Sequence, residues 1–264
     1  MKRAIRTVAN VNQNITTIGP TANIPKVIGV AAASGTTTPT INDRLAIRPV
    51  WQVCYLAGLA ARVPVEGMWT SAGVNPFMSW PARLRTLVKA ADGAAAVVLM
   101  RADLANGVRS QPVRLLGFGQ AIADLPWYRE DPTDWAVDRL AISQAYDMAG
   151  VQAVDLDYLH THDCSHIMSL VMAEEMGYLP HGEGIKAALE GRTRFDGDRP
   201  MTTHGGRHAF GHAWAASSGS DIHEIVTQMR GLAGARQVPK QPEIAALMVQ
   251  GYAIVSNVLI FQGS

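Results

Sequence analysis

The order of apolar segments along the chain restricts the fold more than any other feature of the sequence. Short continuous apolar runs, which are typical of buried strands, alternate with longer segments whose apolar residues recur at helical spacing. The strand-like runs cover residues 27–33, 94–100, 113–119, 154–159, 243–249 and 252–261, and the helical segments cover 134–149, 165–176, 183–190 and 213–232. Strands that alternate with helices predict an α/β protein with buried sheets.

Several residues mark the expected ends of these elements. Asp134 can cap the helix that follows it, because aspartate accepts hydrogen bonds from free N–H groups at a helix start. Gly177 is expected to end the helix that begins at Ser165, and Gly251 is expected to form the turn between the last two strands. Residues 50–63 are apolar but fit a helix and a strand equally well.

Charge is distributed unevenly along the chain. Residues 1–90 contain ten Lys and Arg but only Asp43 and Glu66 as acids, which gives this part a net charge of +8. Residues 91–264 carry a net charge of −7, so the composition changes near residue 90. Such a change indicates a boundary between structural units, or a basic face exposed to solvent.

The overall composition excludes several classes of protein. The whole chain has a net charge of +1 and its basic residues are scattered, so nucleic acid is not the expected partner. No apolar run is long enough to span a membrane, and Met1-Lys2-Arg3 is not followed by the apolar segment of a signal peptide. Two cysteines do not make a disulfide framework. These features favour the cytoplasm.

Histidine points to the part of the chain where chemistry is expected. All eight histidines lie between residues 160 and 223. Histidine is the side chain that most often moves protons near neutral pH and most often binds metals. The second half of the chain therefore holds the candidate site.

Cys164 and His212 together suggest thiol chemistry. Cys164 lies between a predicted strand and a predicted helix, where α/β proteins place their sites and where a helix start lowers the pKa of a thiol. His212 lies at the start of another predicted helix, and an imidazole can move the proton of a thiol. The alternative is that Cys164 is a small buried hydrophobic residue, as most free cysteines are.

A metal site is the third interpretation of this segment. His160, His162, Cys164 and His166 alternate, so they would share one face of an extended chain, and zinc accepts both residue types. However, no CxxC or HExxH spacing accompanies them, and a helix that begins at Ser165 would turn His166 away. We therefore expect no metal.

These residues belong to a set of short motifs that resembles a known family. The motifs are Asp92-Gly93-Ala94-Ala95-Ala96, Leu116-Gly117-Phe118-Gly119-Gln120, His162-Asp163-Cys164, Gly182-Glu183-Gly184, His204-Gly205-Gly206, Gly211-His212, Gln228-Met229-Arg230-Gly231 and Ala235-Arg236-Gln237-Val238-Pro239. In this order and spacing, residues 81–264 resemble a thiolase of the sterol-carrier-protein type or one of its lipid-transfer-like relatives.

The resemblance implies a layered α/β/α fold of the thiolase type. It implies that the C-terminal half is complete and that the N-terminal half is truncated or diverged. Residues 131–264 would form the C-terminal thiolase domain, and residues 81–130 would be the end of the N-terminal half. Residues 1–80 do not align with the family and would be an unrelated basic segment or a remnant of that half. Proteins of this family are usually dimeric.

The resemblance also implies chemistry on coenzyme A thioesters such as 3-oxoacyl-CoA or 3-hydroxyacyl-CoA. The residue that matches His212 is a base that activates a nucleophilic cysteine, the residue that matches His162 helps to hold the thioester oxygen, and Cys164 would be an acid/base. Gly205, Gly206 and Gly211 would contact coenzyme A, which is a substrate here. No tightly bound cofactor is implied.

The sequence departs from the family pattern in ways that affect the activity. The family's acyl-accepting cysteine lies far upstream of the His-Asp-Cys motif. Here Cys54 is the only other cysteine, and its surroundings do not resemble the nucleophile loop. Ser165 replaces the usual Phe, and Ala213 replaces the usual Pro. Some relatives carry out retro-aldol cleavage without a nucleophilic cysteine, which would suit this chain.

Two arginines near the motifs have two interpretations. Arg207 and Arg236 could contact the phosphates of coenzyme A, because guanidinium groups suit phosphate. We favour the alternative that both are solvated surface charges.

Three functional hypotheses follow from the motifs and the departures together. The first is a thiolase-type acyltransferase or carbon–carbon lyase. The second is a non-catalytic thiolase-like subunit that binds acyl-CoA or completes the site of a partner. Such relatives often pair with a small zinc-ribbon/OB-fold protein, and a homo-oligomer is also expected. The third is a fragment without a function of its own.

Overall fold

The computed structural model describes residues 26–31, 77–79, 82–83, 87–105, 111–123, 134–251 and 254–263, the first three ranges by their backbone. Cys54, residues 50–63 and most of the predicted 1–80 segment lie outside the described residues. The predicted domain boundaries therefore stay predictions.

The described part of the chain contains a sheet of six strands with the order β4-β1-β5-β8-β7-β6. β6 and β7 are parallel, and the other neighbouring strands are antiparallel. The strands are β1 (Lys26–Ala31), β4 (Ala96–Arg101), β5 (Val113–Ile122), β6 (Tyr158–Thr161), β7 (Ile244–Gly251) and β8 (Val255–Gln262). A separate ribbon pairs β2 (Phe77–Ser79) with β3 (Ala82–Arg83).

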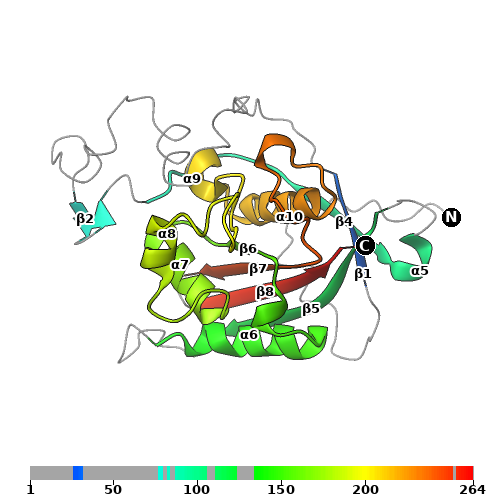
Figure 1. Cartoon of the computed structure of the whole chain (residues 1–264), viewed down its shortest axis with the longest axis horizontal. Helices are drawn as coiled ribbons and strands as arrows, with labels where there is room; N and C mark the ends of the chain where they lie inside the picture. Colours follow the sequence, from blue (N-terminus) through cyan, green and yellow to red (C-terminus); the bar gives the residue numbers. More distant parts are fainter. Residues whose placement is uncertain are drawn as a thin grey trace.

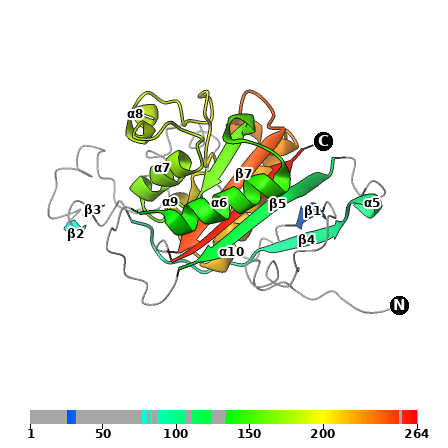
Figure 2. The ribbon, with the colours of Figure 1, turned by 90° about the horizontal axis from the view of Figure 1, so that it is seen from below.

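Helices cover both faces of this sheet (Figures 1 and 2). They are α5 (Ala102–Ala105), α6 (Ala136–Ala149), α7 (His166–Glu175), α8 (Gly184–Leu189), α9 (Gly206–Phe210) and α10 (Ala215–Met229), with short 3-10 turns at Ala153–Asp155 and Gly234–Arg236. None of these helices has the length and apolarity that a bilayer span requires.

The alternation of side chains along β7 builds one core on each face of the sheet. Ala246 and Met248 belong to a core that contains residues of α6 and α7, whereas Leu247 belongs to a core that contains Ile222 and Ile225 of α10. Successive residues of a strand point to opposite faces, so one short apolar strand supplies both cores. The expected layered α/β/α arrangement is confirmed.

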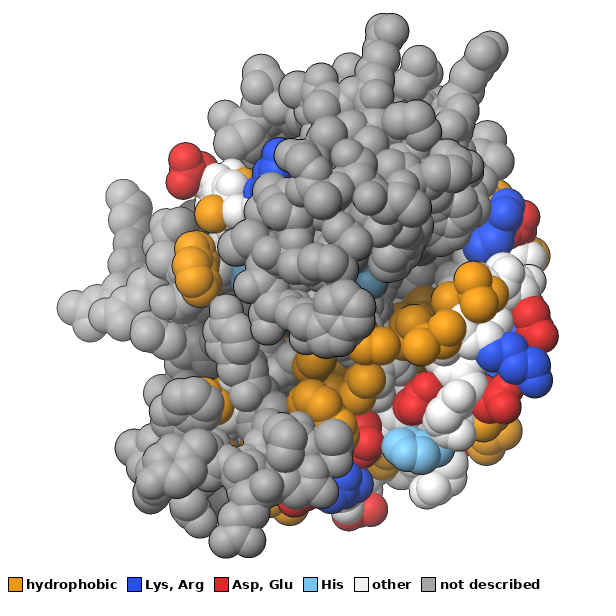
Figure 3. Space-filling model, turned by 90° about the vertical axis from the view of Figure 1, so that its left-hand side faces the viewer, with side chains coloured by type: hydrophobic (Ala, Val, Ile, Leu, Met, Phe, Trp, Pro, Cys, Tyr) orange, Lys and Arg blue, Asp and Glu red, His pale blue; other side chains and the backbone are white. Residues whose placement is uncertain are grey.

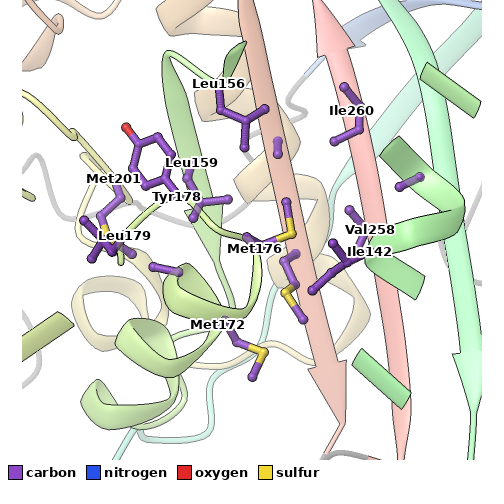
Figure 4. Packing of buried hydrophobic residues seen from close by; sticks show 14 of the residues in the cluster. Ile142, Leu156, Leu159, Met172, Met176, Tyr178, Leu179, Met201, Val258 and Ile260 are labelled. Atoms are coloured by element: carbon purple, nitrogen blue, oxygen red, sulfur yellow. The ribbon is translucent and has the colours of Figure 1, made fainter. Parts of the chain in front are cut away.

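The core under α6 and α7 is closed by flexible side chains. Met172 and Met176 lie between their helix and the sheet, close to Val258 of β8 and Ile142 of α6 (Figure 4). All four side chains are almost completely buried. Burial of each such side chain contributes roughly 1.5–3 kcal/mol, so this core fixes α7 and the loop before it.

The predicted elements are confirmed with small shifts, with one correction. Residues 154–159 do not form one strand, because the segment begins with the Ala153–Asp155 turn and β6 starts only at Tyr158. The Asp155 carboxylate accepts the backbone N–H of Gln152 at 2.8 Å, which favours a turn over an extended strand.

Both of the expected helix ends are present, and the third marked position, Gly251, concerns a turn between strands. The Asp134 carboxylate accepts the N–H of Ala136 at 3.1 Å at the start of α6. Gly177, with φ of 69°, follows α7. Gly251 is the last residue of β7, and residues 252–253 lie outside the described part. The short helix α9 was not predicted.

Gly119 allows β5 and α6 to approach each other closely. A Cβ atom at this position would lie 1.8 Å from the carbonyl oxygen of Ala141 in α6. We expect Gly119→Ala to lower the free energy of unfolding by about 1–3 kcal/mol, because helix and strand must move apart. Urea unfolding followed by circular dichroism measures this change.

Gly251→Ala is the matched control. Among the described residues, none has an atom within 4 Å of where a Cβ atom at Gly251 would lie. Equal unfolding midpoints for the two variants would contradict the close packing of β5 on α6.

Candidate active site

Three chain segments meet at the C-terminal end of β6. The His162-Asp163-Cys164 segment follows β6, and the N–H of His162 donates to the carbonyl of Met248 in β7 at 2.8 Å. Gly205 and Gly206 begin α9, and His212 follows its end. Strand ends and helix starts in α/β proteins are the positions at which functional side chains gather.

A short extended segment, residues 87–91, joins the two predicted catalytic loops. The N–H of Val88 donates to the carbonyl of Cys164 at 3.1 Å. The N–H of His212 donates to the carbonyl of Lys89 at 2.7 Å, and the N–H of Ala91 donates back to His212 at 3.1 Å. Because Val88 and Lys89 are consecutive, the backbones of Cys164 and His212 are held beside each other.

His162 and His212 face each other in this arrangement. Their ring centroids are 5.3 Å apart and the rings are nearly perpendicular, at 79°. Burial lowers the pKa of His162 to about 3, and burial also lowers the pKa of the partly buried His212. The positive charge of Arg207 acts in the same direction on both. Both imidazoles are therefore neutral at neutral pH.

The hydrogen bonds of His212 define where its proton lies. The backbone N–H of Trp214 donates to Nδ1 of His212 at 3.2 Å, and the Ser217 hydroxyl lies 3.3 Å from the same atom. A neutral imidazole that accepts at Nδ1 carries its proton on Nε2. In this form the ring offers an N–H donor, the group that stabilises a negatively charged oxygen.

Cys164 is partly buried, and burial raises the pKa of its thiol. A thiol with a raised pKa stays protonated at neutral pH, so it can donate a proton but is a weak nucleophile. This state differs from the lowered thiol pKa that a helix start alone predicts, because burial outweighs the nearby Arg207.

Asp163 links the His-Asp-Cys segment to α9. Its carboxylate accepts the backbone N–H of Arg207 at 2.9 Å and that of His208 at 3.4 Å. Burial alone would raise the pKa of Asp163, but His208, Arg207 and the backbone N–H of Arg207 together lower it to about 2. The Asp163 carboxylate is therefore ionised and fixes the start of α9.

Arg207 is not a surface charge, and this corrects the interpretation that we favoured from the sequence. Its side chain is 2% exposed. Nη1 lies 3.5 Å from Asp163 and Nη2 lies 2.8 Å from Asp221 of α10. Because this guanidinium is buried between two carboxylates, it is also not exposed to bind a phosphate of coenzyme A. Sequence reasoning missed this role because local sequence does not show burial.

Arg236 is likewise not a freely solvated charge. It contacts the buried carboxylate of Glu224 at 2.9 Å, and its side chain is 30% exposed. Burial alone would raise the pKa of Glu224, but nearby His204 and Arg236 lower it to about 2.

The glycines predicted to contact coenzyme A have contacts within the chain. Gly206 has a φ of 60°, and a Cβ atom there would lie 2.0 Å from the Asp163 carboxylate. At Gly211 a Cβ atom would lie 2.5 Å from Cβ of Ala91. These approaches require glycine without any ligand. Binding of coenzyme A by Gly205, Gly206 and Gly211 stays a prediction.

The structure places further residues near the candidate site that the sequence motifs did not identify. The rings of His166 and His208 stack with centroids 3.8 Å apart. Thr202 and Trp214, on either side of α9, have positive φ angles of 48° and 51°. Positive φ is uncommon for such residues and occurs often at functional sites. The crowding of histidines in the sequence was the signal for the first pair; nothing in the sequence signalled the strained backbone.

Comparison with known families assigns the C-terminal part of the chain. The family model for "Thiolase C-terminal domain-like" proteins matches residues 127–262, just over half of the chain. The chain therefore belongs to this family, and the resemblance to thiolases of the sterol-carrier-protein type is confirmed for its C-terminal segment.

Several curated proteins are similar to this chain over part of their length. An acetyl-CoA acetyltransferase of Methanothermobacter thermautotrophicus is 37% identical over 178 residues, which is 67% of this chain and 45% of that protein. The benzoylsuccinyl-CoA thiolase subunit BbsB of Thauera aromatica is 30% identical over 65% of this chain and 45% of its own. Human sterol carrier protein 2 is 29% identical over 56% of this chain and 28% of its own. The chain spans less than half the length of these relatives.

A solved structure has the same fold. The "Ltp2-ChsH2(DUF35) aldolase" matches with a TM-score of 0.67 and 21% identity, over 83% of this chain and 57% of that one. At this identity the match shows the fold alone.

His208 makes the stability of this region depend on pH. Burial, and then repulsion from His166, lower the pKa of His208 from 6.5 to about 3. Because the unfolded chain binds this proton more tightly, the free energy of unfolding is highest above pH 6.5. It falls as the pH drops below that value. We expect this histidine to cost about 2 kcal/mol of stability between pH 7 and pH 5.

The measurement is the urea midpoint at several pH values. His208→Gln should reduce the loss of stability on acidification. An identical pH dependence of stability in the wild type and His208→Gln would show that His208 does not cause this loss.

Proposed function

We propose that this chain acts on acyl-CoA thioesters and breaks or forms the bond between their α- and β-carbons. The observation that carries the proposal is the meeting of His162, His212 and Cys164, which the 87–91 segment holds together. The membership of the thiolase family supports the substrate class. The relatives are longer than this chain, so their activities enter here as a proposal.

The protonation states favour lyase chemistry over acyl transfer to a cysteine. Cys164 is the one cysteine among the described residues, and its thiol is protonated. In cleavage of a 3-hydroxyacyl-CoA, the hydroxyl loses a proton, the Cα–Cβ bond breaks, and the electron pair moves onto the thioester as an enolate. The α-carbon then gains a proton, so the net reaction moves one proton from oxygen to carbon.

Each of the three residues has a role in this reaction. The Nε2–H of His212, together with His162, donates to the thioester oxygen as negative charge develops on it. Both rings are neutral, so no proton must leave them first. Water in the site accepts the hydroxyl proton, Cys164 gives its own proton to the α-carbon, and the resulting thiolate takes a proton back from that water. The structural neighbour is named an aldolase, which agrees with this reaction type.

The test is turnover by the purified chain. We expect slow release of a shorter acyl-CoA from a 3-hydroxyacyl-CoA, measured by liquid chromatography. His212→Ala should lower the rate about 100-fold or more, because a donor to the developing oxyanion is lost. Cys164→Ala should lower it by a similar factor.

His181→Ala is the matched histidine control, because it changes a histidine on the surface. Activity that survives His212→Ala would rule out this mechanism. Binding of coenzyme A thioesters without turnover, in wild type as in the variants, would leave the non-catalytic subunit as the function.

The subunit hypothesis is favoured by exposed hydrophobic side chains on α7 and α8. Ile167 is 51% exposed, Ile185 58% and Leu189 84%. Ile185 and Leu189 are four residues apart and so lie on one side of α8. On this side of the molecule, hydrophobic side chains form a band across the described surface (Figure 3). We propose that a second copy of the chain, or a zinc-ribbon/OB-fold partner, covers this band.

Two relatives support a partner. BbsB is named as a thiolase subunit, and the neighbouring structure is named as a complex with a DUF35 protein. The double variant Ile185→Asp, Leu189→Asp should convert an oligomer to monomer in size-exclusion chromatography with light scattering. A wild-type chain that is monomeric and retains no partner would contradict this proposal.

A further inference from the structure

Three side chains from distant parts of the sequence converge between β6, the start of α9 and α10. His160 belongs to β6, His204 lies in the turn before α9, and Asp221 belongs to α10. One ligand-type atom from each lies within 4.8 Å of the other two. His160 and Asp221 are buried, and His204 is of intermediate burial.

Two of the three separations between these atoms are close to those between ligands of one metal ion, and the third is within 4.8 Å. Nε2 of His160 lies 3.3 Å from Nδ1 of His204 and 3.6 Å from Oδ1 of Asp221. Zinc bonds of about 2.0–2.1 Å in tetrahedral geometry place neighbouring ligand atoms roughly 3.3–3.4 Å apart. Two histidines and one carboxylate are also an established kind of zinc ligand set.

We propose that His160, His204 and Asp221 form a binding site for a divalent transition metal, with Zn²⁺ as the best match and one coordination position left for water or substrate. The sequence predicted no metal, and the set that it considered differs from this one. His162 faces His212 and His166 stacks on His208, and the present group contains only His160 of that earlier set.

Neighbouring groups orient two of the proposed ligands. The Ser220 hydroxyl lies 3.3 Å from Nε2 of His204, so this ring can bind a metal through Nδ1 and donate its other proton to Ser220. Arg207 holds Oδ2 of Asp221 at 2.8 Å and leaves Oδ1 toward His160. Second contacts of this kind fix the tautomer and direction of metal ligands.

The charged side chains around the group have a net negative charge, which favours binding of a cation. Arg207 stands between Asp163 and Asp221, so these three buried side chains sum to one negative charge when all are ionised. The neighbouring Glu224 is paired with Arg236. A dication would supply the missing positive charge.

One existing contact competes with the metal. The backbone N–H of Gly206 donates to Nδ1 of His204 at 3.1 Å, and a metal on this atom would displace it. Without metal, the same residues form a hydrogen-bonded cluster. A metal site binds a cation saturably, whereas a hydrogen-bonded cluster does not, and a binding experiment distinguishes the two.

The experiment titrates Co²⁺ into the tag-free chain after treatment with a chelator, and follows the visible absorption of tetrahedral cobalt. We expect saturation near one equivalent, displacement by Zn²⁺ and a rise in the thermal unfolding midpoint with Zn²⁺. His204→Gln and Asp221→Asn should weaken binding at least tenfold, whereas His181→Ala should bind as the wild type does. Far-ultraviolet circular dichroism checks that each variant is folded.

Ser220→Ala keeps all three proposed ligands, and it tests the site if the ligand variants do not fold. It should weaken Co²⁺ binding by about tenfold, as loss of an orienting contact does. Absence of saturable binding by the wild type, or binding that persists undiminished in folded His204→Gln, would overturn the proposal. The readout is metal binding, so it is independent of the acyl-CoA activity proposed above.

Discussion

The arrangement of the site depends on one buried ion cluster, Asp163–Arg207–Asp221. Arg207 is almost completely enclosed and bridges the His-Asp-Cys segment to α10. Asp163 also accepts backbone N–H groups at the start of α9. Removing one partner of a buried ion pair costs about 3–5 kcal/mol, because it leaves an unpaired charge in the protein interior. The cluster therefore fixes three segments relative to each other.

This cluster also affects the electrostatics of His162 and His212, the proposed catalytic pair. The buried positive charge of Arg207 lies under His162 and His212, and with burial it keeps both rings neutral. The neutral rings and the protonated Cys164 are donors, which suits a reaction in which negative charge develops on a thioester oxygen. The 87–91 segment completes the arrangement, because one short piece of backbone bonds to both loops.

The candidate site could be predicted in part from the sequence. His162, Cys164 and His212 were found because they lie in short motifs at strand ends and helix starts, and the structure brings their loops together. Arg207 was misjudged because an arginine beside glycines has the same local sequence whether it is exposed or enclosed. The glycines of the motif were interpreted through a ligand, but Gly206 is already required by the approach of the Asp163 carboxylate.

The sequence by itself determined the fold class. Alternating apolar runs and helical segments specify strands and helices, since local periodicity decides which face of each element is buried. Only the tertiary structure decided which polar side chains share a buried space. His160, His204 and Asp221 are far apart in the chain, and they meet because β6 and α10 pack on each other across one core. Contacts between distant residues depend on how elements pack, and local periodicity carries no information about that packing.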